Sequence, residues 1–406
     1  MNNLASHSSD GAVSSSQVPF KGHRTANCSQ AGAVVSKIED IFEKVAQCIL
    51  DEEKEVSIKI KTRGKQSAID YDANTGIITS KSTDEMKTVQ FPSKSPKEAW
   101  KFTAFLRILE LSHEALVKGV VTTKRDPELF VKQAVVDRYV DDIAYTLGVE
   151  RDALNVVCGS AILNILSLTF DKVAAAKGLV AGSFKLTRND GSVIDYWAES
   201  EGMLIANTRE IKSLQLQDIR WILVIEKEAT FRTLATSRYW STCLAGTGLM
   251  LTAKGYPDIQ TRQFLHLLFV HSPCIPIYAL VDFDPDGLGI LSTYKYGSVA
   301  LAHENASLAV PSIRWLGVKS SDIVQIAGEE DKTGQLKLSA RDRRIAGKML
   351  EKDIFAEEGR EAEWRREVQV MLMLNVKAEI QILSSGVGLE KWLDGELDGE
   401  LLQEVP

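Results

Sequence analysis

Long apolar runs and paired cysteines are missing from this 406-residue sequence. No stretch approaches the roughly 18 apolar residues of a membrane span, so no membrane partner is expected. The first twenty residues have neither a basic start nor an apolar stretch, which argues against a secretory signal. The five cysteines stand singly without a CxxC pair. That spacing argues against a zinc ribbon or a disulfide framework and favours reduced thiols in the cytosol or nucleus.

A basic excess, the usual sign of a nucleic-acid partner, is also missing, because the formal net charge is −7. The distribution of charge matters more than the total. Residues 389–406 hold six acids and one lysine, a net charge of −5, and form an acidic tail that we expect to be solvated. The rest of the chain is close to neutral, so a local basic surface is compatible with the sequence.

The length suits two or three domains of about 100–200 residues each. Residues 1–35 are poor in large apolar side chains and rich in Ser, Asn and Gly, so we expect a disordered leader. Ser95 and Pro96 form a helix start. A second helix is expected over 131–147, with Gly148 as its stop and a short helix following. Helix, glycine turn, helix is typical of a helix-turn-helix.

Two strands, 179–188 and 192–197, flank Asn189-Asp190-Gly191, a strong hairpin signal. A helix-turn-helix followed by a hairpin predicts a winged helix. Basic residues at both places are candidates for pairing with DNA phosphates: Lys124, Lys177, Lys185 and Arg188. On composition alone, a solvated basic face explains them equally well.

The second half alternates strands and helices, which favours an α/β domain with a parallel sheet. The expected strands are Trp221–Ile225, Gly248–Thr252, 276–281 and 314–318. Helices are expected over 229–235, 258–269 and 361–383. The overall fold class is therefore α/β, or α+β for the whole chain.

Three acids follow strands of this predicted sheet: Glu226, Asp282 and Asp284. Ligands of open α/β sheets bind outside the carboxyl ends of the strands. Carboxylates gathered there suit Mg²⁺, and substrate phosphates would complete its ligand shell. An isolated Asp-x-Asp is usually a surface turn, but the repeated strand-then-acid arrangement favours a metal site.

Lys254 and Tyr256 lie at another strand-to-helix junction, between Glu226 and Asp282 in the sequence. The lysine could reach a phosphate and the tyrosine could stack on a base or sugar. A capped turn with a packed tyrosine remains an equal alternative from these residues alone.

Seven strings occur in an order that resembles one family: VVTTKRD, PELF, QAVVDRYVDDIAYTLGVERDALNV, AAAKGLVAG, ILVIEKEATF, KGYPDIQTR and VDFDPDG. They are similar to the meiotic DNA double-strand-break transesterases, eukaryotic homologues of the A component of archaeal topoisomerase VI. The resemblance covers roughly residues 98–383. It implies a winged-helix domain over 36–205 and a Rossmann-like Toprim domain over 215–388.

The resemblance also implies an activity, cofactor and partners. Glu226, Asp282 and Asp284 match the family's Mg²⁺ ligands, and Lys254 and Tyr256 match a DNA-contacting motif. In the family, two copies face each other, and each presents a nucleophilic tyrosine to the other's metal site. The implied product is a 5′-phosphotyrosyl link that starts meiotic recombination in the nucleus. Implied partners are double-stranded DNA, a second copy, a B-subunit-like protein and other meiotic accessory proteins, in a type IIB holoenzyme that hydrolyses ATP.

The chain departs from the family pattern in two places. The family pattern Thr-Lys-Arg-Asp-Ile-Tyr-Tyr-x-Asp stops here at Asp126, which runs directly into Pro127. The nucleophilic tyrosine is therefore absent, although Arg125, which would help to stabilise a phenolate, is present. About sixteen extra residues also intervene near 158–173. Taken literally, the polypeptide is a non-catalytic DNA-binding homologue; a nuclease or primase that uses metal and water is a third, weaker reading.

Both departures interrupt otherwise intact motifs, which suggests one mis-spliced junction and one retained intron in the coding sequence. We expect the transcript across codons 120–180 to contain the missing tyrosine codons and to lack the extra ones. Sequencing that transcript tests the expectation. A message that encodes the printed chain would refute it and leave the inactive homologue.

Overall fold

The computed structural model describes most of the chain in thirteen segments. They comprise residues 24–51, 55–61, 69–80, 86–93, 95–118, 122–123, 133–154, 156–157, 177–199, 201–216, 218–326, 334–384 and 388–403. Both sequence departures, between 126 and 127 and near 158–173, lie outside these segments, as do Lys124 and Arg125. Within the described part, no helix is long and apolar enough to cross a bilayer.

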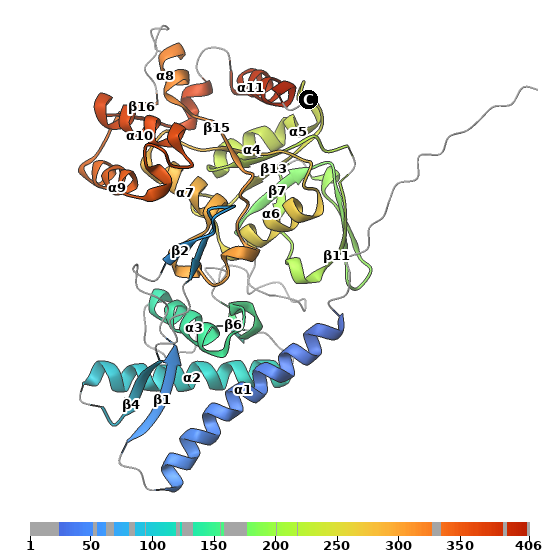
Figure 1. Cartoon of the computed structure of the whole chain (residues 1–406). Coiled ribbons are helices and arrows are strands. Elements are labelled where there is room, and N and C mark those ends of the chain that lie inside the picture. Colours follow the sequence, from blue (N-terminus) through green and yellow to red (C-terminus); the bar gives the residue numbers. More distant parts are fainter. Residues whose placement is uncertain are drawn as a thin grey trace, which may run out of the picture.

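A smaller N-terminal unit packs three helices against a two-stranded sheet, at the bottom of Figure 1. Its elements are α1 (Arg24–Leu50), β1 (Val56–Lys61), β4 (Met86–Phe91), α2 (Pro96–Lys118), α3 (Gln133–Leu147) and the 3-10 turn η2 (Arg151–Leu154). The predicted start of α2 is confirmed, since the Ser95 hydroxyl accepts a hydrogen bond from the Glu98 N–H at 3.2 Å. Gly148 ends α3 with a φ of +62°, a conformation that favours glycine.

A six-stranded sheet forms the centre of the larger unit, in the order β10-β7-β13-β12-β14-β15. The strands are β7 (Leu179–Gly182), β10 (Met203–Leu204), β12 (Trp221–Ile225), β13 (Gly248–Thr252), β14 (Ile277–Leu280) and β15 (Arg314–Gly317). The four strands β13, β12, β14 and β15 pair in parallel, as the alternating pattern predicted. Every residue of β12, β13 and β14 is buried, which is typical of parallel strands covered on both faces.

Helices surround this sheet (Figure 1). The buried hydrophobic side chains of the sheet and of these helices form one large core. The helices are α4 (Glu228–Thr236), α5 (Tyr239–Thr242), α6 (Ile259–His271), α7 (Pro285–Tyr296), α8 (Ser320–Ile326), α9 (Ala340–Leu350), α10 (Ala362–Leu374) and α11 (Leu389–Gln403). Shorter elements complete the chain: β5 (Thr122–Thr123), β6 (Val156–Val157), β16 (Gln335–Lys337), β17 (Val376–Ala378) and 3-10 turns at Tyr196–Ala198, Thr208–Glu210, Val299–Leu301, Asn305–Ser307, Asp353–Phe355 and Ile380–Ser384. The single helix expected over 361–383 is wrong, because α10 ends at Asn375 with a φ of +52° and β17 follows.

The predicted hairpin around Asn189-Asp190-Gly191 is confirmed, but its expected place as a wing is wrong. β8 (Lys185–Arg188) pairs with β9 (Val193–Asp195) and with β11 (Ile211–Gln215). β7, which precedes the hairpin, pairs with β13 in the central sheet. The buried side chains of β7 and β8 belong to the larger core, so the division between the two cores falls before β7 rather than near residue 205.

Two further expectations about the chain ends are corrected. Residues 24–35, assigned to a disordered leader, lie in α1, where Val34 is buried against the smaller core. The acidic tail forms the helix α11, in which Glu390, Glu396 and Asp398 are exposed as expected but one apolar face is buried. Leu393 and Leu397 are both fully buried in the larger core, because leucines four residues apart share one helical face.

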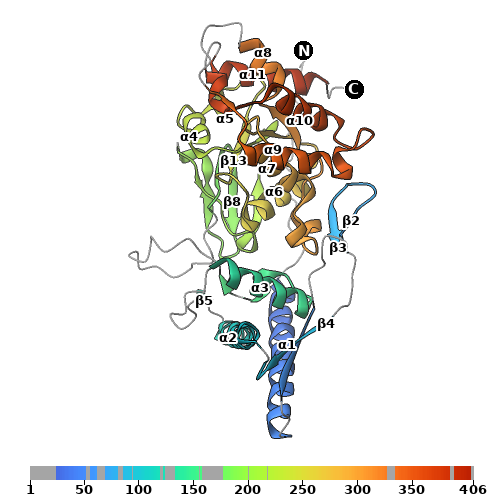
Figure 2. The same cartoon turned by 90° about the vertical axis from the view of Figure 1, so that its left-hand side faces the viewer.

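A second hairpin, β2 (Ile69–Tyr71) with β3 (Ile78–Ser80), lies against the larger unit, as both views show (Figures 1 and 2). The Asn305 side chain donates a hydrogen bond to the Ile78 carbonyl at 2.8 Å. The Arg360 guanidinium donates to the Ala73 and Asn74 carbonyls at the tip. These contacts join the hairpin to segments more than 200 residues away.

Candidate metal and DNA site

Glu226 and Asp282 are neighbours because the strands that precede them are paired. β12 and β14 are parallel, with Ile225 opposite Leu280, so the residues that follow lie at one edge of the sheet. The Glu226 carboxylate accepts a hydrogen bond from the Asp282 backbone N–H at 2.9 Å. The structure thus brings together two of the three predicted acids through a direct contact.

The Asp282 carboxylate is held by a segment from much later in the chain. Its Oδ1 accepts the Ile380 N–H at 2.8 Å, and its Oδ2 lies 3.1 Å from the Lys227 ammonium. Phe283 forms a β-bridge with Ala378, which brings β17 and the following turn against the end of β14. We call the edge of the sheet that carries Glu226, Asp282 and Asp284 the acid edge. It is built from three stretches of sequence: the ends of β12 and β14, and the segment that follows β17.

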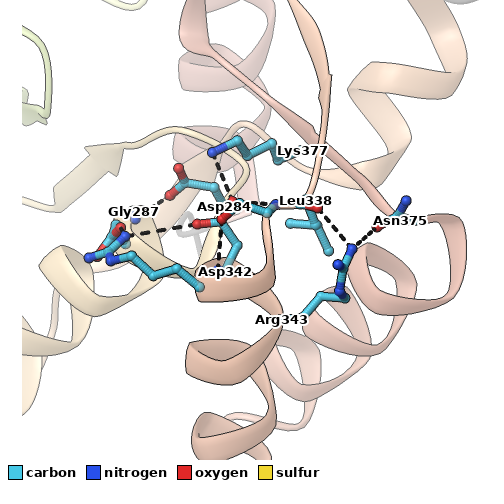
Figure 3. Close-up of polar contacts among 10 residues, drawn as sticks. Asp284, Gly287, Leu338, Asp342, Arg343, Asn375 and Lys377 are labelled. Carbon is cyan, nitrogen blue, oxygen red and sulfur yellow. Dashed lines mark hydrogen bonds and ion pairs between the residues drawn. The ribbon is translucent and has the colours of Figure 1, made fainter.

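Asp284 caps the helix that leaves the sheet. Its Oδ1 accepts the Gly287 N–H at 2.7 Å, which satisfies a free donor in the first turn of α7 (Figure 3). A Cβ on Gly287 would lie only 2.3 Å from the Asp282 carbonyl oxygen, so this tight exit requires glycine. The Asp-Pro-Asp-Gly sequence thereby fixes both Asp282 and Asp284 next to the sheet.

Burial raises the pKa values of all three acids, and the charges of neighbouring carboxylates add to it. Burial is the main cause for Glu226, and the nearby charge of Asp282 adds to it, so that the pKa of Glu226 rises to about 8. Burial likewise raises the pKa of Asp282 and of Asp284. A cation at this edge would favour the charged forms and relieve the repulsion between them.

Lys254 and Tyr256 lie beside the acid edge at the end of β13. Gly255 donates its N–H to the Glu226 carbonyl at 3.0 Å, which joins this turn to β12. The Lys254 ammonium lies 3.0 Å from Glu228, and the Tyr256 hydroxyl is 3.4 Å from Asp286. The Lys177 ammonium donates a hydrogen bond to the Tyr256 carbonyl at 2.7 Å, so Lys177 also lies beside the acid edge. Tyr256 is 49% exposed, which leaves part of its ring available for a ligand.

Two other candidate DNA contacts lie elsewhere. Lys185 and Arg188 belong to the β8–β9–β11 sheet, where they pair with Asp195 at 2.9 Å and Glu210 at 3.8 Å. These ion pairs are on exposed side chains and contribute little to stability. The structure therefore does not place them next to a helix-turn-helix.

Sequence reasoning missed several charged residues around the acid edge. Lys227 immediately follows Glu226, and Asp286 continues the i, i+2 spacing of Asp282 and Asp284, so both had a local signal. Arg341 pairs with Asp286, and Lys377 lies 3.0 Å from Asp342 near Asp284 (Figure 3). These last contacts join α9 to α7 and β17 to α9, and they have no signal in the local sequence.

The donor chemistry of this edge fits a hard divalent cation, although no closed cage is formed. Among the described residues, no group of three or more His, Cys, Asp or Glu side chains is arranged to hold a metal ion as it stands. The carboxylates of Asp282 and Asp284 are turned toward backbone N–H groups, and Asp282 also meets Lys227. Mg²⁺ usually takes only one or two carboxylates and completes its shell with water and phosphate oxygens. An open, carboxylate-rich edge therefore suits it.

Two family models match the chain. Residues 221–390 match the model of the Toprim domain shared by Spo11 and the A-type subunits of topoisomerase 6. Residues 100–156 match the model described as "Type IIB DNA topoisomerase". The first match contains Glu226, Asp282 and Asp284, and the second spans the junction of Asp126 and Pro127.

Several curated proteins are similar over most of the chain. Meiotic recombination protein SPO11 of Homo sapiens is 29% identical, over 90% of this chain and 86% of its own length. Meiotic recombination protein rec12 of Schizosaccharomyces pombe is 34% identical, over 79% of this chain and 83% of its own. The A3 subunit of DNA topoisomerase 6 from Oryza sativa subsp. indica is 35% identical, over 72% of this chain and 62% of its own.

Proposed function

Because this chain belongs to the family of Spo11 and the A-type subunits of topoisomerase 6, we propose that its tyrosine-bearing form is a DNA transesterase that makes meiotic double-strand breaks. In the proposed reaction a tyrosine oxygen bonds to a backbone phosphorus and the bond from phosphorus to the 3′ oxygen breaks. The phenol loses its proton and the 3′ oxygen ends as a hydroxyl. The product is a 5′-phosphotyrosyl link that initiates recombination.

The observation that carries the proposal is the contact between Glu226 and Asp282 at the carboxyl edge of β12 and β14, with Asp284 two residues further along the chain. Toprim domains generally bind divalent metal ions. We assign Mg²⁺ to this edge, with Glu226, Asp282 and Asp284 as the residues that hold it. A bound Mg²⁺ supplies positive charge that offsets the charge developing on phosphate during phosphoryl transfer.

The protein's own side chains would position the DNA backbone beside this edge. Lys254 and Lys177 offer ammonium groups to phosphates, and the half-exposed ring of Tyr256 offers a stacking surface. Lys185, Arg188 and Lys124 remain proposed phosphate contacts at other places on the chain. Arg125 remains the proposed cationic partner of the phenol.

The proposed partners follow from the relatives. Their names suggest a DNA substrate, a multi-protein complex and a nuclear role. We propose more specifically a homodimer in the nucleus, with a B-subunit-like protein and other meiotic accessory proteins. The printed chain, without the tyrosine segment, would keep the DNA- and metal-binding parts of this function; an inactive DNA-binding homologue is therefore the second candidate.

The DNA-binding half of the proposal is tested on the chain without the tyrosine segment. We expect Lys254→Gln to weaken binding to duplex DNA about fivefold and to reduce the salt dependence by about one phosphate contact. Gel-shift titrations at several salt concentrations, with Mg²⁺ present, measure both quantities. Lys391→Gln, an exposed lysine on α11, removes the same charge and should leave binding unchanged. Equal losses in the two variants would argue against a phosphate contact at Lys254.

A further inference from the structure

The Lys227 ammonium lies among three side-chain oxygens from different parts of the chain. It is 3.1 Å from Asp282 Oδ2, 3.2 Å from Glu379 Oε2 and 2.9 Å from Gln381 Oε1. The Lys227 side chain is 23% exposed and that of Asp282 is 10% exposed, so this is a partly buried cluster. An ammonium with three oxygen neighbours has the surroundings that a small metal cation would have.

Lysine is an unfavourable residue at the helix position of Lys227, so its side-chain contacts must account for its presence there. Lys227 is the N-cap of α4, and its side chain makes no capping hydrogen bond. N-caps favour Ser, Thr, Asp and Asn, and a positive charge at a helix N-terminus opposes the helix dipole. Both effects disfavour lysine here. The compensation lies outside the helix, in the ammonium's contacts with Asp282 and the segment after β17.

That segment is held in place without the lysine. Phe283 and Ala378 exchange two backbone hydrogen bonds of 2.8 and 3.1 Å, and the Ile380 N–H binds Asp282 Oδ1. Glu379 and Gln381 flank Ile380 and reach the ammonium from the same side. The backbone that carries Asp282, Glu379 and Gln381 would therefore keep these residues near one another after the lysine is removed.

Carboxylate and amide oxygens are the ligands that hard divalent cations prefer. We propose that Lys227 acts as a resident cation: its ammonium fills a cation position formed by Asp282, Glu379 and Gln381 and keeps a divalent ion out of it. Lys227 is thus a positioning residue for Asp282 and limits how many metal ions the edge takes. The inference rests on the proposed metal function only in assigning another ion to Glu226, Asp282 and Asp284.

The test counts Mn²⁺ ions bound by the full chain without DNA, from the electron paramagnetic resonance signal of free Mn²⁺. We expect Lys227→Gln and Lys227→Met to bind one ion more than the unaltered protein, and Lys227→Arg to bind no more than it. Lys319→Gln is the matched control, because it removes the same charge next to Glu363, from a side chain that is 25% exposed, without touching Asp282. It should add no ion. The double variant Lys227→Gln/Glu379→Gln should lose the added ion again.

The two proposals fail separately in this experiment. The number of ions bound by the unaltered protein tests the proposed function, which requires at least one bound ion. A count of zero would contradict it. The difference between the unaltered protein and the Lys227 variants tests the inference, whatever the first number is. Unchanged or reduced binding in both folded Lys227 variants overturns it, as does an added ion in Lys319→Gln. Circular dichroism of each variant verifies that it is folded.

Discussion

Restoring the Ile-Tyr-Tyr-x-Asp segment after Asp126 and removing residues near 158–173 is expected to yield a covalent protein–DNA adduct, whereas the printed chain should yield none. The reason is that the printed chain lacks the Ile-Tyr-Tyr-x-Asp segment, in which the family pattern places the nucleophilic tyrosine. Tyr139 packs against Phe105 with ring centroids 4.9 Å apart, and Tyr145 packs against His303 at 5.2 Å. Both rings on α3 are held in packing contacts.

The adduct is measured as radiolabelled duplex that stays with the protein in denaturing gels, with a B-subunit-like partner supplied. In the restored chain, Glu226→Gln and Asp282→Asn should each lower the adduct at least about 100-fold, since an active-site metal contributes several kcal/mol. Glu201→Gln, a surface glutamate of the same unit, is the control and should form the adduct normally. An adduct that persists when both acids are replaced would refute the metal assignment.

Leu397→Asp is expected to lower the free energy of unfolding by at least about 4 kcal/mol. Leu397 is fully buried in the larger core, so the change removes a packed side chain and buries a carboxylate. α11 is also joined to the larger unit by polar contacts: Asp394 accepts the Tyr239 hydroxyl at 3.0 Å and the Leu244 N–H at 3.1 Å. Loss of the helix would leave these groups unpaired.

Urea unfolding followed by circular dichroism measures the effect. Leu402→Asp is the matched control on the same helix, because Leu402 is 66% exposed and its replacement should change stability by less than about 0.5 kcal/mol. Equal stability of the two variants would contradict docking of α11 and would favour the solvated tail expected from its charge.

Features set by nearby residues could be predicted from the sequence. The strand over Trp221–Ile225 and the strand over Gly248–Thr252 agree with β12 and β13. Their apolar runs end at polar or turn residues, which mark each boundary locally. The contact between Glu226 and Asp282 also followed, because parallel neighbouring strands end at the same edge.

Features set by remote contacts could not be predicted in this way. β7 has the sequence of a hairpin strand, but its pairing with β13 depends on about 70 intervening residues. The neighbours of Lys227 come from residues 379 and 381, more than 150 positions later. The docking of α11 had a readable signal, since Leu389, Leu393 and Leu397 recur every four residues, but the acidic composition obscured it.

The hairpin formed by β2 and β3 is bound to the larger unit by Asn305 and Arg360. The smaller unit also meets the larger one directly, since the Arg151 N–H donates to Glu304 at 3.0 Å and Tyr145 packs against His303. Swinging the smaller unit away from the larger one would break these direct contacts. The two units are therefore expected to move together as one block.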